Sequence, residues 1–158
     1  MAQFRGLAES DRFDQLVLVA GLAWREAALL RAFGRYLRQA GAPYAQGYIA
    51  DALTRHSDIA ASLIAYFNAK FDPRLPAAER EQRMAQKRAE IEEALDAVTS
   101  LDEDRILRRL INLVDAALRT NFFQTGPDGH PRQTITFKFD CARVDGLPLP
   151  RPLYEFFV

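Results

Sequence analysis

The sequence predicts a mainly α-helical fold, a bundle of about five helices followed by a short C-terminal element of two β-strands. As far as about Thr120, apolar side chains recur at three- and four-residue steps, the spacing that places them on one face of a helix. Beyond a Gly-Pro turn, apolar and polar residues alternate, which is typical of a half-buried strand. We therefore expect a helical domain over residues 1–120, and a turn with two strands over residues 121–158.

The first helical pattern runs from Ser10 to about Gly41. Gly21 lies inside it, and we expect a bend there. Gly41 followed by Pro43 is a stop signal, because glycine accepts the left-handed conformation that ends many helices and proline cannot continue one. The residues expected to face the core are Phe13, Leu16, Val17, Ala20, Trp24, Leu29, Leu30, Phe33, Tyr36 and Leu37.

Two helices are expected next. A short one spans Gln46 to His56, and a longer one runs from Ser57, a potential N-cap, to about Phe71. The stretch from Asp72 to Pro76 then breaks the pattern, since proline suits only the first turn of the following helix. The residues expected in the core here are Tyr48, Ile49, Ala52, Leu53, Ile59, Leu63, Ile64, Phe67 and Phe71.

The last two helices differ in character. The helix expected from about Ala77 to Val98 is highly charged, with a narrow apolar stripe. Ser100 and Glu103 have the spacing of a capping box, which predicts the start of the last helix. The apolar residues of the two helices are, in order, Met84, Ile91, Leu95 and Val98, then Leu107, Leu110, Ile111, Val114 and Leu118.

The chain changes character after Thr120. Residues 126–129 read Gly-Pro-Asp-Gly, which is turn chemistry. Residues 134–139 alternate strictly, with aromatic side chains on one face, and a second strand is expected over residues 153–158. A stiff loop with Pro148, Pro150 and Pro152 connects the two strands.

Composition excludes several classes of protein. Lys and Arg together number 21, as do Asp and Glu, so the formal net charge is zero; we expect no nucleic-acid partner and no binding to an anionic membrane. The longest apolar stretch, residues 16–23, is too short to span a bilayer. Cys141 is the only cysteine, so no internal disulfide can form, and a cytoplasmic location is expected.

The search for a reactive site leads us to predict no catalytic, cofactor-binding or metal-ligating residue in this chain. His56, His130 and Cys141 lie far apart in sequence, whereas a metal site needs several ligands at short spacing. We expect a helix end, a turn and a strand end for them, respectively. No two glycines stand two residues apart, so no dinucleotide-binding glycine fingerprint is present.

Two charged clusters have competing interpretations. The acidic residues Asp102, Glu103 and Asp104 resemble paired carboxylates, but acids in the first turn of a helix also complement its dipole, and that interpretation is preferred. The basic residues could contact phosphate, but acids are interleaved with them, which favours a solvated or salt-bridged face. The basic cluster consists of Arg105, Arg108, Arg109 and Arg119.

Three segments carry a family resemblance. They read LVLVAGLAWREAALLRAFGRYLRQAG from residue 16, SLDEDRILRRLINLVDAALRTNFFQ from residue 100, and PRQTITFKFD followed by GLPLPRPLYEFFV from residue 131. In order and spacing they resemble the large bacterial NAD-specific glutamate dehydrogenases, in the region just upstream of the catalytic domain and entering it. The resemblance implies a parent enzyme that oxidises L-glutamate to 2-oxoglutarate and ammonia with NAD.

The resemblance also implies where the chemistry lies. In this family the substrate segment and the dinucleotide-binding domain come further along the chain, so no catalytic or NAD-binding residue is carried over to this one. We expect the remainder of the parent chain as a partner, a homo-oligomeric parent, and a role of the helices in positioning the catalytic domain or in subunit contacts. The apolar end, Phe156 to Val158, is expected either because the natural polypeptide continues or because a C-terminal strand packs on the helices; the first is the simpler account. The alternative is a freestanding helical interaction module without enzymatic activity.

Overall fold

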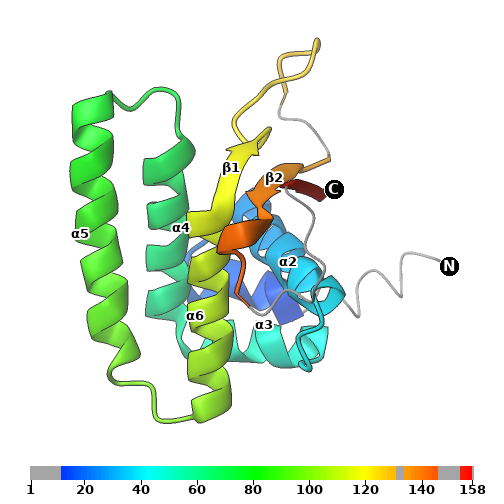
Figure 1. Cartoon of the computed structure of the whole chain (residues 1–158), viewed down its shortest axis with the longest axis vertical. Helices are drawn as coiled ribbons and strands as arrows, with labels where there is room; N and C mark the ends of the chain where they lie inside the picture. Colours follow the sequence, from blue (N-terminus) through cyan, green and yellow to red (C-terminus); the bar gives the residue numbers. More distant parts are fainter. Residues whose placement is uncertain (1–11, 131–133, 146–153, 158) are drawn as a thin grey trace, which may run out of the picture.

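The structure is a computed structural model that describes residues 12–130 and 134–145 and the backbone of residues 154–157. The predicted helix start at Ser10 and the proline-containing loop of residues 146–152 lie outside the described residues. The described part is mainly helical and carries a small sheet, which confirms the predicted fold class (Figure 1). None of its helices is long and apolar enough to cross a membrane.

The first predicted helix is two helices, one over residues 12–19 and α2 (Trp24–Gln39). Gly21 adopts φ 69°, a left-handed conformation that ends the first helix rather than bending it. Ala23 is extended and precedes α2, and its N–H donates to the Glu26 carboxylate at 2.9 Å. Because the chain turns between the two helices, the predicted core position of Trp24 is wrong, and its side chain is exposed.

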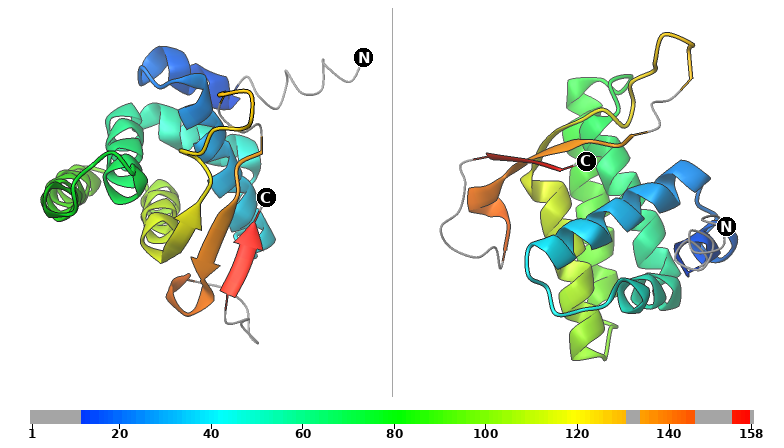
Figure 2. Two further views of the ribbon diagram at one scale, coloured as in Figure 1. Left: turned by 90° about the horizontal axis from the view of Figure 1, so that it is seen from above. Right: turned by 90° about the vertical axis from the view of Figure 1, so that its right-hand side faces the viewer.

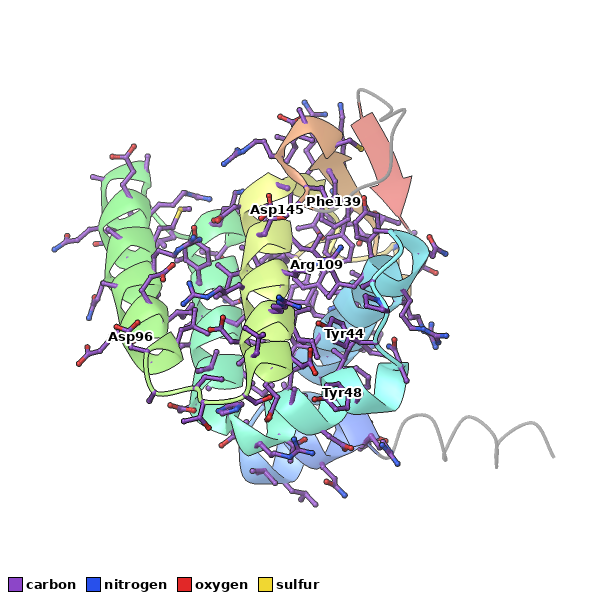
Figure 3. The ribbon with its side chains drawn as sticks, turned by 60° about the horizontal axis from the view of Figure 1, so that its bottom comes forward. Tyr44, Tyr48, Asp96, Arg109, Phe139 and Asp145 are labelled. Carbon is purple, nitrogen blue, oxygen red and sulfur yellow. The ribbon has the colours of Figure 1, made fainter. Side chains whose placement is uncertain are left out.

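The next boundaries follow the sequence closely. Gly41 has φ 94° just beyond α2, and α3 (Gln46–Arg55) and α4 (Ser57–Phe71) cover the predicted ranges. The predicted capping role of Ser57 is wrong: Ser57 is the first helical residue, and His56 occupies the cap position without a side-chain hydrogen bond. Tyr48 is not a core residue either, because it is exposed at the surface and stacks on Tyr44 (Figure 3).

Two long helices complete the bundle. The helix α5 (Ala77–Leu95) packs on α4 and lies on its outer side, away from the sheet (Figures 1 and 2). The helix α6 (Leu101–Ala116) begins where predicted, since the Ser100 hydroxyl accepts a hydrogen bond from the Glu103 N–H at 3.3 Å. Both helices end earlier than expected.

The sheet has one strand more than predicted. The chain leaves α6 at Ala117 with an extended backbone and forms β1 (Ala117–Thr120), which the sequence assigned to the last helix; the predicted buried position of Leu118 is therefore wrong. The strands β2 (Phe137–Asp140) and β3 (Tyr154–Phe157) lie at the predicted places. The order is β1-β2-β3, and both pairings are antiparallel.

Aromatic rings join the sheet to the helices. From β2, Phe137 lies 5.0 Å from Phe33 of α2 and 6.3 Å from Phe67 of α4, measured between ring centroids. Phe139 lies 4.5 Å from Tyr36. These buried rings belong to one hydrophobic cluster that includes residues of α2, α3, α4 and α6 and of the sheet. The alternation of the predicted strand therefore places its aromatic face against the helices.

Candidate functional site

The residues considered for metal binding or catalysis lie apart in the structure. His56 is at the junction of α3 and α4, with its Nε2 3.3 Å from the Glu103 carboxylate. His130 follows the predicted turn, and its backbone N–H donates a hydrogen bond to the Asp128 carboxylate. Cys141 is buried in a short 3-10 helix, Cys141–Arg143. Within the described residues, no three His, Cys, Asp or Glu side chains are grouped as a metal site.

The acidic cluster occupies the first turn of α6, as predicted, and its members have different partners. Glu103 is turned inward and is buried, and its carboxylate contacts Arg55 at 3.1 Å as well as His56. Asp102 accepts a hydrogen bond from the Tyr44 hydroxyl at 3.3 Å. The cluster therefore connects the start of α6 to α3 and to the segment that precedes it.

The arginine cluster is divided among separate contacts. Arg108 forms ion pairs with Asp104 at 3.0 Å and Glu92 at 3.4 Å, in agreement with the predicted salt-bridged face. Arg109 donates to the backbone carbonyl of Asp145 at 3.3 Å, on the side of α6 that faces the chain after β2 (Figure 3). Arg105 and Arg119 are exposed. Two of the four arginines, Arg108 and Arg109, are thus engaged in contacts within the chain.

A lysine of α4 holds the carboxyl end of α6. The Lys70 ammonium donates to the backbone carbonyls of Val114 at 2.7 Å and Asp115 at 2.9 Å. Carbonyls in the last turn of a helix lack intrahelical partners, and a cation placed there also complements the helix dipole. The pKa of Lys70 is lowered to about 8, chiefly by burial and also by the nearby charge of Arg143, against the opposing effect of Asp115.

The side chain of Asp115 is the centre of a second group of contacts. Its Oδ1 accepts a hydrogen bond from the Tyr66 hydroxyl at 2.5 Å, and its Oδ2 pairs with Arg88 of α5. The pKa of Tyr66 is raised to about 12, chiefly by burial and also by the hydrogen bond to Asp115, whereas Arg88 acts in the opposite direction. The groups are paired with one another across α4, α5 and α6, an arrangement suited to joining helices.

An arginine of α2 holds the chain just beyond β1. Arg25 donates from Nε and from a terminal nitrogen to the backbone carbonyl of Phe122, at 3.3 and 2.9 Å. Its guanidinium also lies over the Phe122 ring, 4.8 Å from the centroid, and burial lowers its pKa. The chain is therefore held at both ends of strand β1, by Lys70 just before the strand and by Arg25 just after it. We call these contacts the two β1 anchors.

The surface near the anchors is hollowed in two places. One hollow, of about 360 Å³, is lined by Arg25, the 72–74 turn and residues 122–125. The other, of about 290 Å³, lies between α4 and α5 and is lined by Ala65, Asn68, Ala69, Asp72, Leu75, Arg83 and Lys87. In the first hollow, the Arg74 guanidinium is engaged by the Asp72 carboxylate through two hydrogen bonds of 3.0 Å. Neither hollow brings together the residues that the sequence analysis considered for chemistry.

Sequence reasoning missed the β1 anchors, and the one signal near them concerns the Asp115 side chain rather than the carbonyls that the anchors hold. Asp115 is the only charged residue between Leu110 and Leu118, and a charge that is partly buried requires a partner. Lys70 and Tyr66 stand four residues apart among the apolar residues of α4. The sequence therefore contained both partners of the Tyr66–Asp115 hydrogen bond, but it did not show that α4 and α6 are neighbours.

Two family models match the chain, in two successive regions separated by residues 74–89. Residues 8–73 match the model described as glutamate dehydrogenase, helical motif 3. Residues 90–158 match the model described as bacterial NAD-glutamate dehydrogenase, catalytic domain. Of the anchoring residues, Arg25 and Lys70 lie in the first region, and the carbonyls that they hold lie in the second.

Curated relatives are similar along nearly the whole chain. The chain is 46% identical to an NAD-specific glutamate dehydrogenase of Mycobacterium tuberculosis over an alignment of 159 residues. This alignment covers 99% of the chain and 10% of that protein. It is 45% identical to the protein of the same name in Pseudomonas aeruginosa and 41% identical to that of Halomonas elongata, over 97% of the chain in each case. The chain thus spans about a tenth of the length of the relatives that it matches.

Proposed function

Since the chain belongs to the bacterial NAD-specific glutamate dehydrogenases, we propose that it joins the helical region of such an enzyme to the beginning of its catalytic domain and holds the two in a fixed relation. In this proposal, the segment itself performs no chemistry. It determines where the small sheet lies on the helices, and the sheet in turn belongs to the part that matches the catalytic domain.

The β1 anchors carry this proposal. Lys70 and Arg25, from the helical-motif region, hold backbone carbonyls immediately before and after β1, in the catalytic-domain region. Hydrogen bonds from charged donors are stronger than those between neutral groups, at about 1.5–3 kcal/mol each. Because the acceptors are backbone atoms, the contacts position the chain itself rather than one side chain.

For the whole enzyme, we propose the reaction that the names of the relatives indicate, oxidation of L-glutamate with NAD to 2-oxoglutarate and ammonia. NAD would bind to parts of the polypeptide outside this segment. We also propose that the enzyme is a cytoplasmic homo-oligomer and that the helices contribute to subunit contacts. The balanced charge and the apolar helix faces motivate these last points.

The test uses the full-length enzyme with Lys70→Met. We expect the amides of β1 and of the end of α6 to exchange hydrogen about tenfold faster, the equivalent of about 1.4 kcal/mol, because two charge-assisted hydrogen bonds are lost. We also expect turnover to fall with the change in position of the sheet. Lys87→Met is the matched control, since this α5 lysine pairs with a side chain in its own helix, Glu90 at 3.1 Å.

Two results would contradict the proposal. One is unchanged hydrogen exchange at β1 in the Lys70 variant. The other is faster exchange at β1 with full turnover, which would leave Lys70 with a purely structural role. Lys70→Arg should restore part of the protection and of the turnover, because the guanidinium retains the charge and the donors.

A further inference from the structure

The turn between the first two helices exposes large apolar side chains. We call residues 17–24 the apolar corner; they read Val-Leu-Val-Ala-Gly-Leu-Ala-Trp. Leu18 is 85% exposed, Val19 54% and Trp24 65%, and Leu22 is the buried member. The other exposed large apolar residues of the described chain are scattered over α3, α6 and β1. Clusters of this kind on a protein surface commonly mark contact sites.

The backbone produces this exposure directly. Had the helix continued through Gly21, as the sequence predicted, Trp24 would share the buried stripe of Phe13 and Leu16. The left-handed Gly21 instead starts a new helix axis, and Trp24 becomes its first residue. The corner is therefore a structural feature with a defined backbone conformation.

Charged side chains close in sequence to the apolar corner are already paired within the chain. Arg31 binds Asp14 at 3.1 Å, Arg12 binds Asp51 at 3.0 Å, and the Glu26 carboxylate accepts the Ala23 N–H. What the corner offers to a partner is therefore apolar surface. A tryptophan flanked by aliphatic side chains is the type of residue that dominates binding energy in protein interfaces.

The size of the corner favours a contact within one polypeptide. Three side chains expose on the order of a few hundred Å², whereas a stable association between separate chains buries about 800 Å² on each partner. A covalently connected partner needs less area, because its effective concentration is in the millimolar range. The relatives are about ten times as long as this chain, so most of such a polypeptide lies outside residues 1–158.

We propose that the apolar corner is an intramolecular docking site, on which an apolar surface from another part of the same enzyme polypeptide, outside residues 1–158, covers Leu18, Val19 and Trp24. The inference rests on the family membership that also underlies the proposed function. It adds a second point of attachment between this segment and the rest of the enzyme, separate from the β1 anchors.

The first experiment measures whether the corner is covered. In full-length Leu18→Cys enzyme, the rate of maleimide labelling at position 18 is measured by peptide mass spectrometry and compared with the rate in urea-unfolded enzyme. We expect at least tenfold protection in the native enzyme. Cys141, which is buried, provides the benchmark for a fully protected thiol in the same sample. Equal native and unfolded rates would overturn the inference, because position 18 would then be open to solvent.

The second experiment identifies the occupant. A photoreactive p-benzoylphenylalanine replaces Leu18 in the full-length enzyme, and the products of irradiation are separated on a denaturing gel. We expect crosslinks at the mass of a single polypeptide that join position 18 to a peptide outside residues 1–158. A product of twice that mass would identify a second copy, and a crosslink within residues 1–158 would identify the segment itself. Either result would overturn the inference.

These measurements do not depend on activity, so they are separable from the test of the β1 anchors. Protection of position 18 together with a Lys70→Met enzyme of normal turnover would support the docking site and reject the positioning role. An unprotected position 18 together with a Lys70 variant of low turnover would reject the docking site and support the positioning role.

Discussion

The helices α5 and α6 are of similar length, 19 and 16 residues, but they are stabilised in different ways. Eight residues of α6 are buried, including Leu107, Leu110 and Val114, whereas α5 buries two, Ile91 and Leu95. The helix α6 lies among α3, α4 and the sheet, whereas α5 covers the outer side of α4 (Figure 2). One helix is part of the core, and the other is a cover on it.

This difference indicates which of the two helices fixes the arrangement of the neighbouring elements. Contacts from the neighbouring helices converge on both ends of α6, at Glu103 and at Asp115. On α5, the ion pair Lys87–Glu90 lies within the helix, and the pair Arg88–Glu92 does so as well. Arg88 and Glu92 also reach α6, at Asp115 and Arg108, so α5 is attached mainly through exposed or partly exposed charges on one side. Residues 74–89, which form most of α5, also lie between the two regions that the family models match. We infer that α6 connects the two regions, whereas α5 shields α4.

Truncation of side chains in the two helices should give the largest difference. Leu110→Ala in α6 is expected to lower the free energy of unfolding by about 2–5 kcal/mol, because a fully buried leucine leaves a cavity. Met84→Ala in α5 should cost about 1 kcal/mol, since that side chain is only partly buried. Urea unfolding followed by circular dichroism measures both values. Equal costs would show that α5 contributes to the core as much as α6 does.

The polar contact between the two helices should have a smaller effect. Asp115→Asn removes the charge that pairs with Arg88 and accepts the Tyr66 hydroxyl. A fully buried pair would cost 3–5 kcal/mol and an exposed one less than 1; because both side chains are partly exposed, we expect about 1–2 kcal/mol. The control is Glu90→Gln, which removes an ion pair that lies within α5. A loss of stability no larger than that of the control would mean that Asp115 does not join α5 to α6.

The sequence predicted the elements that depend on local signals and missed those that depend on distant contacts. The periodic stripes predicted α3, α4 and the buried face of α6 within a few residues. The end of α2 and the start of α6 were also predicted, because they depend on the local signals Gly41 and Ser100. Where the outcome depends on contacts distant in sequence, the prediction was wrong. The backbone of Ala117–Thr120 is extended because it pairs with Phe137–Phe139, and Lys70 holds the helix end beside it.

The candidate site shows the same limit. The sequence identified His56, Glu103 and Arg108 as residues needing an explanation, and their local roles at helix ends and in salt bridges were predicted. The β1 anchors could not be predicted, because Lys70 and Arg25 bind backbone carbonyls 44 and 97 residues away, and a carbonyl carries no residue-specific signal. The break at Gly21 was underestimated, since a glycine inside a helical pattern permits a bend and a complete turn alike.

The pH dependence of stability should separate two groups at the end of α6. The pKa of Lys70 is lowered from 10.5 to about 8, so between these values the folded chain binds fewer protons than the unfolded one, and stability should rise with pH. The pKa of Tyr66 is raised from 10.0 to about 12, so in that range its contribution should fall as pH rises. Because Lys70 is half-buried, screening keeps the rise below the limit of about 1.4 kcal/mol per pH unit for one proton.

Variants assign these slopes to the residues. In urea unfolding between pH 7 and pH 12, Lys70→Met should lack the rise between about pH 8 and pH 10.5, and Tyr66→Phe should lack the fall between about pH 10 and pH 12. The difference from the parent chain cancels the titration of the other groups. Suppose instead that the free energies of unfolding of the parent chain and the Lys70 variant change in parallel between about pH 8 and pH 10.5. Folding would then leave the pKa of Lys70 at its ordinary value.

The smallest effect is expected at the surface of α5. Glu90→Gln removes the ion pair with Lys87, three residues earlier in the same helix, at 3.1 Å. Such exposed pairs contribute about 0.2–0.5 kcal/mol, and salt weakens them further. We therefore expect a loss of that size in urea unfolding at low ionic strength and none at 1 M NaCl, where the Debye length is about 3 Å. A loss above about 1 kcal/mol that persists in salt would mean that α5 depends on specific tertiary electrostatics, and the contrast with α6 would then no longer hold.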